Sequence, residues 1–159
     1  MRLEALNSLG LAELGELLHN CCGSAVWVGK MRVLFPVGSA EELFAAAVEV
    51  WRACEEKDWR EAFGHHPRIG GAATSLWAAA EQAGTIGAGA GMLEALAEGN
   101  RIYEERFGYI FIVCATGKPA VEMLGLLRGR LGNEPEKEIL IAMGEQEKIT
   151  RIRLEKLLS

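Results

Sequence analysis

The sequence predicts an all-α fold: a single compact, bundle-like domain of about seven to nine helices. Apolar residues recur mostly three and four residues apart, which is the spacing of helices with one buried face. The 159 residues suit one domain of about 150 residues. Only residues 109–115 have the apolar, β-branched composition of a strand, and no second such segment can pair with them. We therefore expect one short, buried, extended segment near 109–115 in an otherwise helical domain covering residues 1–159.

The earlier helices are predicted from periodicity and capping. Leucines three and four residues apart predict a helix over residues 11–18. Ser39 and Glu42 form a capping box, in which each residue satisfies a free backbone N–H of the first turn. That box opens a second helix. Two further helices are expected over residues 78–83 and 92–107.

The last helix is predicted to be long. Asn133 and Glu136 give an N-terminal signal, and Pro135 falls in the first turn, where a missing N–H is harmless. The helix can then run nearly to Ser159. Residues 64–71, which hold a proline and three glycines, are expected to form a loop or turn. The glycine-rich residues 84–91 are expected to form a flexible connection.

Composition argues against several classes of function. The formal net charge of −5 disfavours a nucleic-acid partner. No apolar stretch approaches the roughly 20 residues that span a bilayer, so we expect no membrane association. The four cysteines include no C-x-x-C pair, which indicates a reducing compartment and no metal site. We expect a cytoplasmic protein.

The string His65-His66-Pro67 contains two of the three histidines. Histidine titrates near neutrality and is the usual acid–base residue, yet a structural turn explains the same string. Pro67 keeps the preceding residue out of the α region, so it helps to fix where the His66 ring points.

Two charged residues beside apolar positions are open to two interpretations. Glu81, among alanines, is either on a solvated helix face or a partly buried acid with a raised pKa. Arg153 borders the apolar side of the last helix, where it either covers the core with its stem or binds a carboxylate.

These strings occur together with others in a fixed order. They are HPRIG at 66–70, W-A-x-x-E-Q-x-G at 77–84, N-x-x-Y-x-x-RFGYIFIVCATGK at 100–118, RLGN at 130–133 and KITRIRLEKL at 148–157. C-G-S-x-x-W at 22–27 fits the same order. The chain resembles, from about residue 9 to residue 158, the OHCU decarboxylases, which act on 2-oxo-4-hydroxy-4-carboxy-5-ureidoimidazoline in urate degradation.

The resemblance implies an all-α homodimer that needs no cofactor and forms (S)-allantoin and CO₂. It implies that His66, rather than His65, and Glu81 are catalytic. The substrate-binding residues that it implies are Pro67, Gln82, Phe111, Ile112, Val113, Ala115 and Arg153. The family often has serine where this chain has Ala78, so one substrate hydrogen bond is in doubt. The preceding enzyme of the pathway, hydroxyisourate hydrolase, is a candidate partner.

Two other functions stay open on the sequence alone. One is a non-catalytic helical binding or scaffold module that keeps the fold, for which Ala78 is the only hint. The other is a hydrolase that uses Cys114 on a ureido compound. Cys114 lies within an apolar run, which makes a thiol a poor nucleophile.

Overall fold

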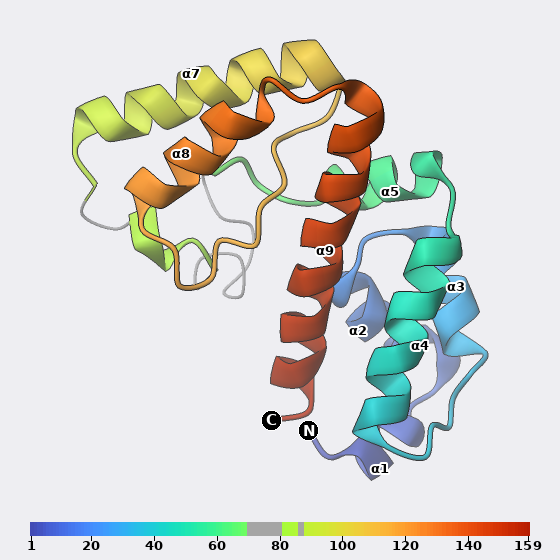
Figure 1. Ribbon diagram of the computed structural model, residues 1–159. Helices are drawn as coiled ribbons and strands as arrows, with labels where there is room; N and C mark the ends of the chain where they lie inside the picture. Colours follow the sequence, from blue (N-terminus) through green and yellow to red (C-terminus); the bar gives the residue numbers. More distant parts are fainter. Residues whose placement is uncertain (70–80, 86–87) are drawn as a thin grey trace. The chain divides into compact units, whose positions relative to one another are not determined.

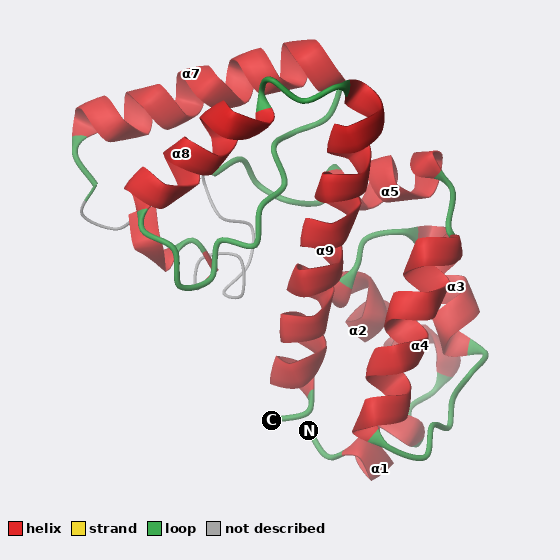
Figure 2. Cartoon of the chain, viewed as in Figure 1, coloured by secondary structure: helices red, strands yellow, loops and turns green. Residues whose placement is uncertain are grey.

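The computed structural model describes residues 1–69, 81–85 and 88–159. Within these ranges the regular elements are eight α-helices and one 3-10 helix, with no strand (Figure 2). The all-α class and the expected number of helices are therefore confirmed. The chain divides into two compact units, one of residues 1–62 with 146–159 and the other of residues 63–145.

The first unit is built on two successive helix packings. It contains α1 (Leu3–Asn7), α2 (Leu11–Cys21), α3 (Ala25–Arg32), α4 (Ala40–Ala53), most of α5 (Glu56–Phe63) and the last part of α9 (Pro135–Leu157) (Figure 1). Helix α2 packs on α3, and α3 packs on α4. The fully or almost fully buried side chains of these helices include Leu14, Leu18, Trp27, Met31, Leu43 and Trp51.

Side-chain caps set where α3 and α4 begin. The Ser24 hydroxyl accepts the Trp27 N–H at 3.2 Å. At α4 the Ser39 hydroxyl accepts the Glu42 N–H at 3.1 Å, as the capping box predicts. The returning Glu42 carboxylate accepts the N–H of Gly38 at 2.7 Å instead of that of Ser39. The reciprocal half of the box is therefore displaced by one residue.

The second unit is built around α7 (Ala90–Phe107) and α8 (Ala120–Arg130), which pack together. It also contains the 3-10 helix η1 (Ala83–Thr85) and the first part of α9. Helix α7 begins two residues before the predicted Met92. The predicted helix over residues 78–83 lies mostly outside the described residues; of its described positions, Glu81 is helical and Ala83 begins η1.

The segment from Gly108 to Gly117 joins α7 to α8 without forming a helix or a strand (Figure 1). Both end glycines have left-handed backbone angles, with φ of 83° and 76°, and Gly108 also ends α7. Residues 111–115 between them are all buried. The sequence prediction of a short buried segment without a strand partner is confirmed.

The predicted early and late helices are also confirmed. The helix expected over residues 11–18 is α2, and the long C-terminal helix is α9, which starts at Pro135. Asn133 stands two residues before this start, and its amide donates a hydrogen bond to Glu138 Oε2 at 2.9 Å. A search of the described residues for a helix long and apolar enough to cross a membrane finds none.

The left-handed Gly108 gives a direct test of the fold. Gly108→Ala is expected to lower the free energy of unfolding by about 1–2 kcal/mol, because a Cβ atom disfavours this conformation. Gly125→Ala is the matched control, since Gly125 is exposed within α8 and an added Cβ meets nothing within 4 Å. The control is expected to raise stability by up to about 1 kcal/mol. Denaturant unfolding of both variants measures the contrast, and equal effects contradict the assignment.

Candidate active site

The two histidines of the His-Pro string differ in exposure. His65 is exposed, whereas His66 and Pro67 are half-buried. The His66 backbone N–H donates to the Phe63 carbonyl at 3.2 Å, which forms the turn at the end of α5. Of the two neighbours, His66 is therefore the more buried.

The loop after His66 is attached to one face of α7. The Arg68 guanidinium donates two hydrogen bonds to the Glu104 carboxylate, at 3.0 and 2.7 Å. One turn earlier on α7, the Asn100 amide donates to the Ile69 carbonyl at 3.4 Å. The hydrogen bonds from Arg68 to Glu104 raise the pKa of the Arg68 guanidinium. Two contacts one turn apart hold the loop that carries His66.

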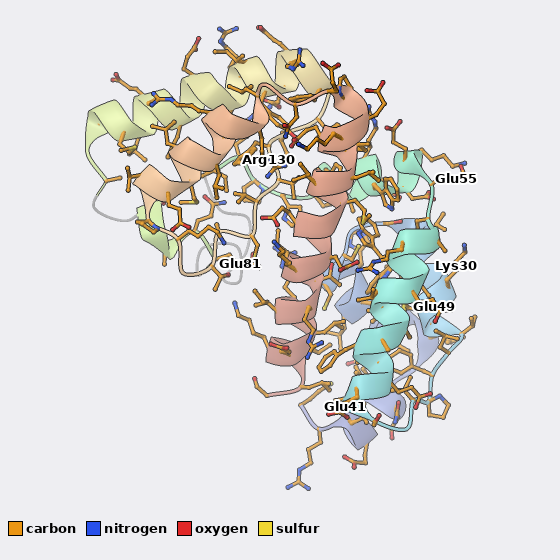
Figure 3. All side chains as sticks on the ribbon, viewed as in Figure 1. Lys30, Glu41, Glu49, Glu55, Glu81 and Arg130 are labelled. Carbon is orange, nitrogen blue, oxygen red and sulfur yellow. The ribbon has the colours of Figure 1, made fainter. Side chains whose placement is uncertain are left out.

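Glu81 and Gln82 are buried, with 8% and 9% of their surface exposed. Of the two interpretations of Glu81, the solvated helix face is therefore wrong, because the side chain is buried. Figure 3 labels Glu81 beside η1. The Gln82 carbonyl accepts both the Thr85 N–H, at 3.0 Å, and the Thr85 hydroxyl, at 2.9 Å. These bonds close the turn directly after Glu81.

Lys118 connects this turn to the segment between the two glycines. A Cβ atom on Gly84 would lie 1.9 Å from the Lys118 carbonyl oxygen, so only glycine permits this approach. The Lys118 ammonium in turn donates to the Cys114 carbonyl at 2.8 Å. The Glu81–Thr85 turn therefore lies against the backbone at Lys118, and the Lys118 side chain reaches back to the segment 111–115.

Charged side chains also bind the middle of that segment. The Arg130 guanidinium donates to the Ile112 carbonyl at 2.5 Å. The Glu145 carboxylate accepts the Cys114 N–H at 3.1 Å. Together with Lys118, these residues give the segment the hydrogen bonds that a neighbouring strand supplies in a sheet.

Arg130 belongs to a buried polar cluster. Its guanidinium lies 2.6 Å from the Glu138 carboxylate, and Glu138 is 0% exposed. The Tyr103 hydroxyl donates to the same carboxylate at 2.6 Å. Burial, with the hydrogen bond to Glu138, raises the pKa of Tyr103. The guanidinium also lies over the Phe111 ring, 4.5 Å from its centre. Figure 3 labels Arg130 on α8.

Arg153 lies in the first unit, whereas the other predicted site residues lie in the second. It is half-buried, and its guanidinium donates to the Asn20 carbonyl at 3.0 Å. The structure therefore gathers the His66 loop, the Glu81–Gln82 turn and residues 111–115 within one unit. The predicted role of Arg153 in substrate binding stays a prediction.

Four charged residues that the sequence analysis did not single out shape this unit: Lys118, Arg130, Glu138 and Glu145. A weak signal was available for Arg130, which follows Met123 and Leu127 on the buried face of α8 at helical spacing. Its partner Glu138 lies on another helix, and no local pattern reveals that pairing.

The cysteines and the metal-ligating residues offer no further catalytic site among the described residues. None of the four cysteines forms a disulfide, and all four are buried. Burial raises the pKa of Cys22 to about 12. Among the described residues, no group of three or more His, Cys, Asp or Glu side chains could hold a metal ion. Cys114, the nucleophile of the hydrolase hypothesis, is only 6% exposed.

Comparisons with known proteins cover nearly the whole chain. The family model described as OHCU decarboxylase matches residues 7–155. The 2-oxo-4-hydroxy-4-carboxy-5-ureidoimidazoline decarboxylase of Amia calva is 32% identical, over 98% of this chain and 93% of that protein. The uric acid degradation bifunctional protein TTL of Arabidopsis thaliana is 37% identical over 87% of this chain, which spans 45% of that relative's length.

Solved structures agree with these matches. A crystal structure of OHCU decarboxylase in the presence of (S)-allantoin is 37% identical, with a TM-score of 0.81 over 88% of this chain and 95% of that one. An (S)-allantoin synthase structure, 21% identical with a TM-score of 0.73, supports the fold. The helical fold and these matches define the class as a decarboxylase, a lyase. The chain belongs to the OHCU decarboxylase family.

The attachment of the His66 loop to α7 can be tested by Arg68→Ala. If His66 is catalytic, as the resemblance implies, losing both bonds to Glu104 is expected to lower kcat about tenfold, because displacing a catalytic side chain by a fraction of an ångström slows the reaction. The free energy of unfolding is expected to change by about 1 kcal/mol or less, because Arg68 is exposed. Arg101→Ala is the control, since Arg101 pairs with Glu98 and Glu105 on α7 without touching the loop. Identical kcat values for the two variants contradict this positioning.

Proposed function

We propose that this chain converts 2-oxo-4-hydroxy-4-carboxy-5-ureidoimidazoline to (S)-allantoin and CO₂ without a cofactor. The observation that carries the proposal is the family match over residues 7–155, which spans both units and every predicted site residue. It also supports treating residues 1–159 as one decarboxylase domain. The relatives named for uric acid degradation place the family in that pathway.

The substrate supplies its own electron sink. The carbon that loses CO₂ carries a hydroxyl, and its neighbour is a C=N carbon. The pair of electrons from the broken carbon–carboxylate bond forms a double bond to that neighbour, and the C=N electrons move onto nitrogen. The hydroxyl then gives up its proton to become the product carbonyl, and the neighbouring carbon gains a proton on one face. The nitrogen that received the C=N electrons also takes up a proton, so one proton is consumed for each CO₂ released.

We assign the proton transfers to His66 and Glu81. The half-buried His66 ring suits the hydroxyl, because an imidazole exchanges protons near neutral pH. The buried Glu81 carboxyl suits delivery of a proton to one face of the neighbouring carbon. Pro67 restricts the backbone of His66 and borders the same loop.

Substrate binding is assigned to groups with fixed hydrogen-bonding geometry. Gln82 offers an amide beside Glu81, and Arg153 offers a guanidinium fork for the carboxylate or the urea-like carbonyls. The backbone of Ile112, Val113 and Ala115 is assigned to the ring amides. The buried Phe111 provides an apolar wall, which favours spreading of charge as CO₂ leaves. Trp77, for which we propose a similar role, lies outside the described residues.

The assembly and compartment are part of the same proposal. We propose a cytoplasmic homodimer that acts directly after hydroxyisourate hydrolase. A bifunctional relative from Bacillus sp. (strain TB-90) is matched over 99% of this chain but only 32% of its own length. Such relatives carry this domain as one part of a longer chain, which supports a functional link to a second enzyme.

The assignment between the two histidines can be tested by alanine substitution. His66→Ala is expected to lower kcat about 10²–10⁴-fold, as loss of a general acid–base residue does. His65→Ala is the control and is expected to change kcat less than threefold, because its side chain is exposed. Turnover is measured with the unstable substrate generated in the cuvette. Equal loss in both variants contradicts the assignment.

Glu81→Gln separates positioning from proton delivery. Glutamine keeps the shape of the side chain but has no carboxyl proton to transfer, so CO₂ release is expected to continue more slowly while water protonates the product from either face. Circular dichroism of the product, followed alongside CO₂ release, is expected to show a drift toward racemic allantoin. Arg153→Lys is the binding control and is expected to raise KM most, because lysine lacks the guanidinium fork. Full rate and pure S product from Glu81→Gln refute the role of Glu81.

A further inference from the structure

Three successive peptide groups in the segment 112–115 are each held on one side by a charged side chain. Arg130 holds the Ile112 carbonyl, Glu145 holds the Cys114 N–H, and Lys118 holds the Cys114 carbonyl. The cations bind the two carbonyls and the carboxylate binds the N–H. Each charge therefore has the sign that its backbone partner requires.

The other polar group of each peptide points the opposite way. The carbonyl and the N–H of one trans peptide are directed to opposite sides of the chain, and the described part of the molecule has only one cis bond, before Pro36. The groups left on the far side are the N–H of Val113, the carbonyl of Val113 and the N–H of Ala115. No hydrogen bond to described residues involves any of the three.

From this arrangement we infer that Arg130, Glu145 and Lys118 are positioning residues that aim one backbone edge, Val113–Ala115, at the substrate. Along the chain this edge presents a donor (the Val113 N–H), an acceptor (the Val113 carbonyl) and a donor (the Ala115 N–H). A cyclic urea or ureido group that offers carbonyl, N–H and carbonyl matches it in order. The inference rests on the proposed function. It assigns to these three residues the role of fixing the orientation of the peptide groups on this edge.

The anchors are suited to this work because two of them come from rigid elements. Arg130 is held by Glu138, whose carboxylate also receives hydrogen bonds from Tyr103 and Asn133. Glu145 lies on α9, seven residues after Glu138, which corresponds to two helical turns and the same side of the helix. The left-handed glycines at 108 and 117 end the segment on either side.

The test uses variants at Glu145 and Lys118, because both side chains are half-buried. Arg130 is left unchanged, since its removal strands the buried Glu138 charge and risks unfolding. Glu145→Ala and Lys118→Met are each expected to raise KM about three- to tenfold, the equivalent of one lost hydrogen bond, with kcat within about twofold of the wild type. Glu145→Gln keeps an acceptor oxygen and is expected to restore KM to within about twofold.

A second measurement reports on the edge itself. Titration with (S)-allantoin is expected to shift the Val113 and Ala115 amide resonances of the wild-type protein, and to need several times more ligand in Glu145→Ala. Glu147→Ala is the control on the same helix, because Glu147 pairs with Arg52 and touches no backbone of the segment. It is expected to behave as the wild type in both measurements.

The outcomes separate the two proposals. If Glu145→Ala and Lys118→Met have wild-type KM values, amide shifts and turnover, the positioning role is overturned and the decarboxylase function still stands. A KM increase in Glu147→Ala as large as that in Glu145→Ala also overturns it. A folded wild-type protein that neither turns over the substrate nor binds (S)-allantoin overturns the proposed function and the positioning role with it.

Discussion

The second unit depends on the buried ion pair between Arg130 and Glu138. Such a pair loses the hydration of both ions, and it is tolerated only where further hydrogen bonds satisfy the remaining donors and acceptors. Tyr103 and Asn133 donate hydrogen bonds to the Glu138 carboxylate, and the Ile112 carbonyl accepts one from the Arg130 guanidinium. The pair thus joins α7, α8, α9 and the loop before α9 to a segment that belongs to none of these helices.

This pairing explains how a sequence with the composition of a strand is accommodated in a helical fold. A buried backbone must find partners for its N–H and C=O groups, and residues 111–115 have no neighbouring strand among the described residues. Charged side chains replace the missing strand on one edge. On the opposite edge, the Val113 N–H and carbonyl and the Ala115 N–H have no hydrogen bond to described residues. Under the proposed function this edge binds the ligand, so the structural solution and the binding surface have one cause.

Local sequence signals predicted the elements whose causes are local. Periodicity located α2, capping residues located α4 and α9, and two glycines bounded the segment before α8. The anchors of that segment were not predictable, because Arg130 and Glu145 contact backbone 18 and 31 residues away in sequence. The buried state of Glu81 was not predictable either, because the alanines around it allow both a solvated and a buried face. His66 was distinguished from His65 only by Pro67 and the family pattern, and the structure adds the difference in exposure.

Under the proposed function, binding and chemistry are carried by different kinds of group. Side chains of His66 and Glu81 move protons, so a substitution there removes the reacting atom. The Val113–Ala115 edge is main chain, and no substitution at those positions deletes its carbonyl or, proline apart, its N–H. Mutation can therefore change the geometry of this edge mainly at Arg130, Glu145 and Lys118, which bind the opposite side of the backbone. Sensitivity of ligand affinity at Glu145 or Lys118 then has a physical reason, since a peptide that rotates by a few tens of degrees loses the alignment on which its hydrogen bonds depend.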